Sequence, residues 1–208
     1  MNKPLRWKLF PGFFVLALLL SILINSCQSS LHGFNYWWQE PGTLSQKAPN
    51  SRFIIFTQSN NSINSRIAQD QLVYFCDNPS IQSYLYLKGE RLNTANQSRI
   101  QQKLLQDNYQ FAVLMYLSKT EPDSTELYSH TGSLMSDYFS LIDPYFYNPI
   151  YEGPARDYIV IAKVYKVADE SLVYEVVSKR YQNTPPEIAM KACSELLVKQ
   201  LKKGGIMK

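Results

Sequence analysis

Runs of apolar residues separated by polar turn signals predict three short strands between positions 51 and 90. Arg52–Thr57 is aromatic and β-branched, which favours extended structure, and the Asn/Ser-rich stretch Ser59–Ser65 after it is typical of a turn. Gln71–Cys76 and Ser83–Leu87 have the same strand-forming character, and Asp-Asn-Pro and Lys-Gly follow them as turn signals. We therefore expect strands in these three ranges.

A helix and a buried strand are predicted next. Thr94 and Gln97 have the spacing of a capping box, and the residues that follow place their leucines and isoleucine on one side. Asp107-Asn108 is suited to end this helix, because asparagine accepts the left-handed backbone conformation common at helix C-termini. Phe111–Leu117 is almost continuously apolar, which predicts a central strand covered on both faces.

The C-terminal part of the chain predicts a hairpin and a closing helix. Tyr158–Tyr165 and Leu172–Ser178 form two strand-like runs around the turn Ala168–Ser171. Thr184–Glu187 is a second capping box with proline at a favoured first position, and Gly204 follows the lysine-rich last turn. The predicted core stripe of this helix consists of Ile188, Ala189, Ala192, Cys193, Leu196, Leu197 and Leu201.

Residues 119–157 break the pattern, because four prolines and many aromatic side chains interrupt it. A connection this long without clear periodicity is uncommon in a compact domain and is often functional. Two interpretations stand: a binding surface, or a satellite cluster that buries its own rings. The residues predicted to bind a partner are Tyr138, Phe139, Tyr145, Phe146, Tyr147 and Tyr151.

The first 27 residues have the layout of an export signal. Three bases and no acid precede the apolar run Leu9–Ile24, and small polar residues lead to Cys27. Leu31–Asn50 then predicts a tether broken by glycine and proline. The aromatic group Phe34–Trp38 within it fits either an interfacial anchor or a first strand that packs on the domain.

The segment Ile24-Asn25-Ser26-Cys27 resembles the lipobox of bacterial lipoproteins. This resemblance implies that residues 1–26 are removed and that the thiol of Cys27 carries acyl chains such as palmitate, which hold the protein on a membrane. The alternative is an uncleaved signal anchor, although Leu9–Ile24 is shorter than the ~20 apolar residues that span a bilayer comfortably. Gln28 after the cysteine implies the outer membrane, facing the periplasm, by the sorting rule of enteric bacteria.

The charge balance gives no sign of nucleic-acid binding. The formal net charge is +4, but three of the bases belong to the predicted signal, so residues 27–208 are close to neutral. That length fits one domain with a substantial core, which we place at residues 51–208 after a lipid-anchored tether at 27–50. Cys76 and Cys193 remain, and they fit a periplasmic disulfide as well as two buried free thiols.

No catalytic, cofactor or metal motif emerges from the sequence. The histidines are His32 and His130, no cysteine, histidine or acid set has zinc spacing, and neither a nucleophile elbow nor a glycine-rich phosphate loop occurs. We therefore expect no enzymatic activity, no cofactor and no metal.

The order of helix, strand, insertion, hairpin and helix, together with the lipobox, resembles small bacterial envelope lipoproteins of unknown function. The matching parts are Thr94–Lys119 and Asp157–Lys203, and they carry no functional residue except Cys27. The predicted fold is α+β, with a mixed or antiparallel sheet of about five strands and two helices on one face.

Three functional hypotheses follow. The first is a non-catalytic binding or assembly lipoprotein that contacts another envelope protein through its aromatic stretch. The second is a lipid or glycan carrier whose aromatic residues line a groove. The third is an envelope hydrolase that uses His130.

Overall fold

The computed structural model describes residues 34–41, 50–59, 62–90, 92–118, 133–140 and 157–208. The chain divides into two units, residues 1–32 and 33–208, and every described residue belongs to the second. The predicted signal and Cys27 therefore lie outside the described residues.

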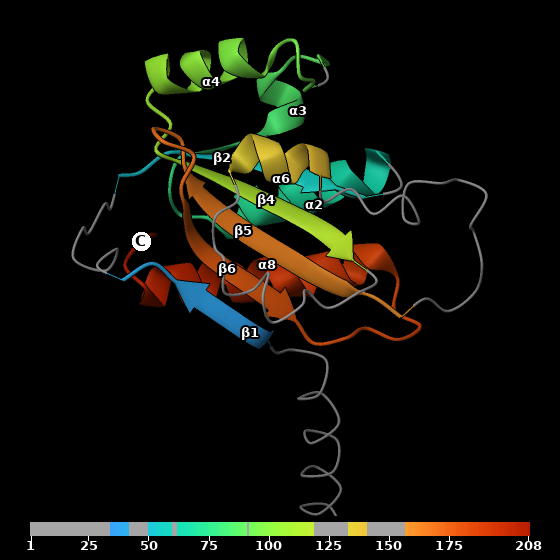
Figure 1. The fold of residues 1–208 in the computed structure, drawn as a ribbon. Coiled ribbons are helices and arrows are strands. Elements are labelled where there is room, and N and C mark those ends of the chain that lie inside the picture. Colours follow the sequence, from blue (N-terminus) through green and yellow to red (C-terminus); the bar gives the residue numbers. More distant parts are fainter. Residues whose placement is uncertain (1–33, 42–49, 60–61, 91, 119–132, 141–156) are drawn as a thin grey trace, which may run out of the picture. The chain divides into compact units, whose positions relative to one another are not determined.

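Six strands form one mixed sheet in the order β1-β6-β5-β4-β2-β3 (Figure 1). Their bounds are β1 Phe34–Gln39, β2 Phe53–Gln58, β3 Ser80–Gln82, β4 Phe111–Ser118, β5 Ile159–Lys166 and β6 Leu172–Ser178. Neighbours from β1 through β6 and β5 to β4 are antiparallel, whereas β4, β2 and β3 run parallel. The predicted α+β class is confirmed, with six strands where about five were expected.

Helices cover both faces of this sheet (Figure 1). On one face, here the α2/α8 face, lie α2 (Ser62–Phe75) and α8 (Pro186–Lys203), whose buried side chains join Phe53, Ile55 and Met115 in one core. On the other, the α4/α6 face, lie α3 (Ser83–Tyr86), α4 (Gln97–Gln106) and α6 (Leu134–Ser140), which pack over Ile54 and Leu114. Two long helices thus lie on one face, but they are α2 and α8. The two helices predicted to share a face, α4 and α8, lie on opposite faces of the sheet.

The strands predicted from apolar runs are confirmed where burial is complete. Every residue of β2 and β6 is buried, and β4 is buried except at its two ends. β4 occupies an inner position between β5 and β2, as expected for a run without alternation. Of the two interpretations of Phe34–Trp38, the strand holds: β1 pairs with β6, so the sheet begins before the predicted domain boundary at residue 51.

Two predicted strands are wrong. Gln71–Cys76 lies mostly in α2, which begins at Ser62 inside the predicted turn region, and Ser83–Leu87 contains the short helix α3. The side chains that α2 buries are Ala68 and Gln69 and, four and three residues later, Leu72, whereas Tyr74 is 80% exposed. This helical spacing buries one stripe against the sheet, and that burial outweighs the strand propensity of Leu72–Phe75.

Both predicted helices, α4 and α8, form, but neither predicted capping box does. The N-caps are Asn96 and Pro185, and neither makes a side-chain capping bond. Before α4, the Asn93 side chain instead accepts bonds from the amides of Ala95 and Asn96, each at 3.0 Å. The predicted exit is confirmed, because Asn108 has a φ of 58°.

The closing helix α8 buries most of the predicted stripe. Ala189, Ala192, Cys193, Leu197 and Leu201 are buried, whereas Leu196 is half-buried. Ile188, predicted as a core residue, is 56% exposed in the first turn of the helix. The helix ends at Gly204, as expected.

Candidate functional site

The predicted aromatic binding residues divide between described and undescribed segments. Tyr138 and Phe139 lie in α6, whereas Tyr145, Phe146, Tyr147 and Tyr151 lie outside the described residues. The site can therefore be built from α6 and the residues around it.

Tyr138 is bound to the sheet. Its ring meets Phe56 edge-on at a centroid distance of 5.8 Å, and its carbonyl accepts a 2.6 Å bond from Nε2 of Gln58. Phe139 packs edge-on against Tyr138 at 5.3 Å and is half-buried. The first two residues of the predicted aromatic surface thus contribute to packing, and Phe139 keeps part of its ring accessible.

A buried charge cluster fixes α6 to the sheet. The ammonium of Lys163 on β5 donates to Oδ2 of Asp137 on α6 at 2.7 Å, and the Tyr165 hydroxyl donates to the same oxygen. Glu175, directly across the strand pair from Lys163, places Oε1 3.6 Å from the ammonium. All three charged side chains are at most 14% exposed, so these contacts act with little screening by water.

The cluster contains two carboxylates and one ammonium, and burial changes the pKa values of two of its members, Glu175 and Tyr165. Burial raises the pKa of Glu175 above its ordinary 4.5, although Lys163 opposes the shift. Burial also raises the pKa of Tyr165, and the nearby Asp137 carboxylate adds to the effect, so this phenol stays protonated and remains a donor. Each group is satisfied by another member, so the cluster positions α6.

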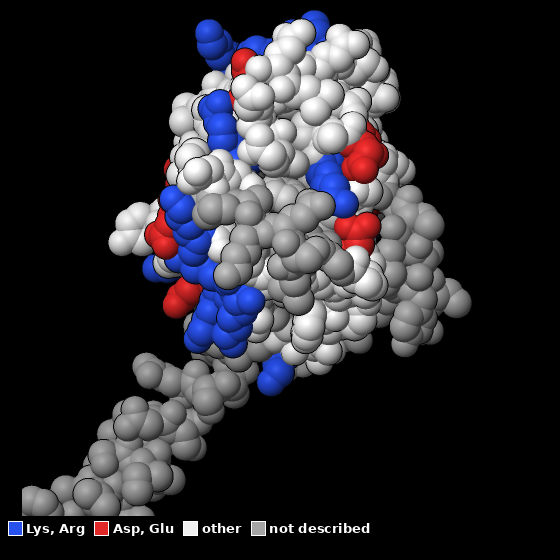
Figure 2. Space-filling model, turned by 90° about the vertical axis from the view of Figure 1, so that its left-hand side faces the viewer, with Lys and Arg blue, Asp and Glu red and all other residues white. Residues whose placement is uncertain are grey.

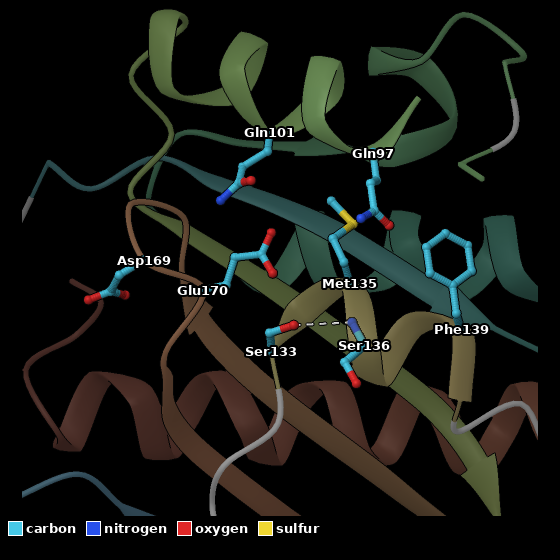
Figure 3. A pocket seen from close by; sticks show the side chains of 8 residues that line it. All are labelled: Gln97, Gln101, Ser133, Met135, Ser136, Phe139, Asp169 and Glu170. Carbon is cyan, nitrogen blue, oxygen red and sulfur yellow. Dashed lines mark hydrogen bonds between the residues drawn. The ribbon is translucent and has the colours of Figure 1, made fainter. Parts of the chain in front are cut away.

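A surface pocket of about 530 Å³ lies between α4, α6 and the β5–β6 turn (Figure 3). It is lined by Gln97, Gln101, Ser133, Met135, Ser136, Phe139, Asp169 and Glu170. Two side-chain amides line it from α4. The apolar side chains of Met135 and Phe139 and the hydroxyl of Ser136 line it from α6, and Ser133 just before α6 adds a second hydroxyl. Such a mixed lining suits a ligand or peptide with both hydroxyl or amide groups and an apolar surface.

The β5–β6 turn directs Glu170 into this pocket. Glu170 has a φ of 56°, which residues with a side chain seldom adopt, and its carboxylate points towards the space below α4 (Figure 3). Asp169 at the rim has a structural role, since its carboxylate accepts bonds from the amide and hydroxyl of Ser171 at 3.0 and 2.7 Å. These bonds lower the pKa of Asp169. Glu170 is therefore the acidic group of the turn that faces the pocket.

The two cysteines of the domain are free thiols in the structure. Cys193 is fully buried on α8, and Cys76 lies just after α2, so it does not end a strand as expected. Sγ of Cys76 lies 3.8 Å from Sδ of Met207. Burial raises the pKa of both thiols to about 12, which disfavours the reactive thiolate.

Within the described ranges, no group of three or more histidine, cysteine or acidic residues has a metal-binding arrangement. His32 and His130 lie outside those ranges. None of the helices in the described ranges has the length and apolar character needed to cross a membrane.

Sequence reasoning missed the pocket and the charge cluster. A signal for the cluster was present: Lys163 and Glu175 are lone charges inside the otherwise apolar runs of β5 and β6. A charge in the middle of a buried strand needs a partner, and the two residues face each other in the hairpin. Asp137 could not be assigned to them, because it lies on a different element.

Fold and site define a domain with a six-stranded mixed sheet between helical layers and a pocket on the α4/α6 face. Its sequence matches no protein-family model, and no curated protein matches it significantly. Solved structures similar to it include the PelC dodecamer from Paraburkholderia phytofirmans, with a TM-score of 0.41 and 6% identity over 80% of this chain and 96% of that one.

The similar solved structures also include lipoprotein GNA1162 from Neisseria meningitidis, with a TM-score of 0.37 and 8% identity over 74% of this chain and 99% of that one. Both likenesses are too remote to carry a function, a partner or an assembly state to this chain.

Proposed function

We propose that the protein is a lipid-anchored accessory of the bacterial cell envelope that binds another envelope protein without catalysing a reaction. The anchor is the acylated Cys27, supported by the export signal and the lipobox-like residues 24–27. Gln28 supports the outer membrane as the site of attachment, with the domain in the periplasm.

The observation that carries the binding role is the pocket beside α6. It is concave and preformed, and α6 is fixed by the Lys163–Asp137 ion pair beneath it. A rigid binding element lowers the conformational entropy lost on association. Phe139 places part of an aromatic ring at the pocket, and the aromatic residues 145–151 follow it closely in the chain.

The absence of catalysis is part of the same proposal. The buried acids Asp137 and Glu175 contact Lys163, and the free thiols are buried or partly buried with raised pKa values. The pocket itself contributes amides, hydroxyls and Glu170, a set suited to hydrogen bonding.

Photocrosslinking in cells tests the binding role. A photoreactive phenylalanine analogue at Phe139 is expected to give one dominant protein adduct, identified by mass spectrometry. The same analogue at Tyr74, which is 80% exposed on α2 on the opposite face, is the matched control. Equal adducts at both positions, or none at Phe139, would contradict a partner at this pocket.

A second candidate function is the binding of a glycan, because the pocket lining is rich in amide and hydroxyl groups beside one aromatic ring. Amides and carboxylates bond sugar hydroxyls, and an aromatic ring covers the apolar face of a sugar. Titration with neutral and N-acetylated oligosaccharides, followed by NMR, tests this function. Binding that Gln101→Ala weakens and Gln182→Ala leaves unchanged would support it over a protein partner.

A further inference from the structure

One end of the sheet is defined by the strand pairing, and we call it the Phe34 end. Phe34, the first residue of β1, pairs with Ser178, the last residue of β6. Ser118, the last residue of β4, pairs with Ile159, the first residue of β5. β2 is parallel to β4 and also ends there. The chain therefore enters the domain at the end of the sheet where β2, β4 and β6 finish.

The two long helices of the α2/α8 face begin at the same end. The Thr57 hydroxyl near the end of β2 donates a 2.6 Å bond to the carbonyl of Ser65 in α2. The hydroxyl of Tyr158, just before β5, donates a 2.6 Å bond to the carbonyl of Thr184, just before α8. The first turns of both helices are thus held at the Phe34 end.

Exposed isoleucines gather in these first turns. Ile63 of α2 is 62% exposed, and Ile67 lies one turn further on the same side. Ile188 of α8 is 56% exposed. One exposed apolar residue is ordinary, but large apolar side chains at the start of two adjacent helices are expected to be covered in the working state.

Among the residues that the structure describes at this end, bases outnumber acids. Among the described residues of the strand ends and first helical turns, the bases are Arg66, Lys179, Arg180 and Lys191, and the acids are Asp157 and Glu187. Lys179, Arg180 and Lys191 are exposed. Isoleucines next to an excess of bases match an anionic lipid surface, which takes up apolar side chains and attracts lysine and arginine.

Chain length limits how far this end can lie from the anchor. Phe34 follows Cys27 by seven residues, so even a fully extended linker separates them by at most ~25 Å. For the opposite end of the sheet this upper limit is larger by the length of β1, about 20 Å for six residues. Lys and Arg also gather at that opposite end (Figure 2), but there Lys166 pairs with Glu40 and Lys202 with Asp77.

We propose that the Phe34 end docks on the anionic lipid surface of the membrane that holds Cys27, with Ile63, Ile67 and Ile188 at the headgroup level. This inference rests on the proposed lipidation of Cys27. The docked domain directs α4 and the β5–β6 turn, and with them the pocket, towards the opposite side from the membrane, where a periplasmic partner reaches it.

Lipid photocrosslinking tests the docking. The full chain, produced in bacteria and reconstituted in phosphatidylethanolamine vesicles with phosphatidylglycerol, carries the photoreactive phenylalanine at position 188. The control carries it at Leu105, which is 42% exposed near the end of α4, where Asp107 bonds Arg52 at the start of β2. Phospholipid adducts are expected at position 188, and none at position 105.

The charge requirement is tested in the same vesicles. Lys179→Glu with Lys191→Glu is expected to lower the adduct yield several-fold, as is removal of phosphatidylglycerol. Lys199→Glu with Lys203→Glu, at exposed positions near the other end of α8, is expected to leave the yield unchanged. Thermal unfolding of all variants controls for loss of fold.

The intact mass separates the two ways in which this inference can fail. An acylated chain without lipid adducts at position 188, or with equal adducts at position 105, overturns the docking and leaves the anchor standing. A chain without the acyl mass overturns the proposed anchor and the docking with it. A protein adduct at position 188 in cells would assign this end to a partner protein.

Discussion

At the scale of single residues, the decisive feature is the pair of carboxylates that shares Lys163. A buried ion pair contributes little net stability, because desolvation offsets the attraction, yet removing one partner leaves an uncompensated charge. Lys163 has two such acids around it, so the three residues are not equivalent. Replacing the base should therefore lower the free energy of unfolding much more than replacing one acid.

Lys163→Met is expected to lower the free energy of unfolding by about 3–5 kcal/mol, since Asp137 and Glu175 would be left buried without a cation. Glu175→Gln, which keeps the shape and removes the excess charge, is expected to be neutral or stabilising at pH 7. Urea unfolding of both variants measures this difference. A Glu175→Gln chain as unstable as Lys163→Met would mean that Glu175 is a needed partner.

The raised pKa of Glu175 makes the effect of Glu175→Gln depend on pH. Because the folded-state pKa lies above 4.5, Glu175 favours folding below pH 4.5, and this contribution is lost as the pH rises through the folded-state pKa. The stability gained by Glu175→Gln over the native chain should therefore grow from pH 4.5 upwards. Unfolding curves at several pH values check the slope, and a gain that shrinks with pH would contradict it.

The thiols provide a second test at this scale. A pKa of about 12 in place of 9.0 lowers the thiolate fraction at pH 8 roughly 10³-fold, so Cys76 and Cys193 should resist iodoacetamide in the native protein. In the denatured protein, both cysteines should react with iodoacetamide at the rate of a solvent-exposed cysteine. Mass spectrometry of alkylated peptides gives the two rates, and rapid native labelling of Cys193 would contradict its place in the core.

At the scale of elements, α4 illustrates how one helix divides between core and solvent. Leu104 is fully buried on the α4/α6 face, whereas its neighbour Leu105 is 42% exposed. Both residues are leucines with the same helix propensity, so a difference between the same substitution at the two positions reports on burial alone.

Leu104→Ala is expected to cost about 2–5 kcal/mol of unfolding free energy, because it removes buried methyl groups and leaves a cavity. Leu105→Ala is expected to cost well under half as much. Chemical denaturation of the two variants compares them directly. Equal losses would show that α4 packs in a different register.

The element α2 shows where local propensity misleads. Leu72–Phe75 contains strand-forming residues, yet the chain folds them as the end of a fourteen-residue helix. This helix contacts α8, β2 and β3, and its Ala68 and Leu72 lie in one core with residues of β2 and α8. The segment is helical because it packs against residues that are distant in the sequence. A prediction from neighbouring positions alone does not include those contacts.

At the scale of the whole molecule, the sheet has a stable centre and weaker edges. β4 pairs with β5 over its whole length and with β2 over its first six residues. By contrast, β3 is a three-residue edge strand, and β1 pairs with β6 with a register irregularity between Phe34 and Tyr36. Edge strands open at lower free energy than central ones.

Hydrogen exchange should follow this arrangement. Amides of Val113–Met115 are expected to exchange only with global unfolding, and those of Ile81 and Trp37 by local opening at much lower free energy. Exchange measured by NMR over a range of denaturant concentrations distinguishes the two regimes. Global protection of Trp37 would mean that the β1 edge is covered in solution, as by a second chain.

The sequence by itself determined the elements whose signals are local. The buried strands β2, β4, β5 and β6 appear as apolar runs, α4 and α8 as apolar stripes between polar flanks, and the anchor hypothesis at Cys27 as a contiguous motif. Each of these depends on residues close together in the chain. The same holds for the left-handed exit at Asn108.

Only the tertiary structure decided the rest. The helical state of residues 62–75, the placement of α4 and α8 on opposite faces, and the junction of Asp137 with Lys163 all depend on contacts between distant positions. The pocket and the Phe34 end likewise join side chains from separate elements. Burial and charge pairing act through space, so these features arise when the sheet and its two helical layers assemble.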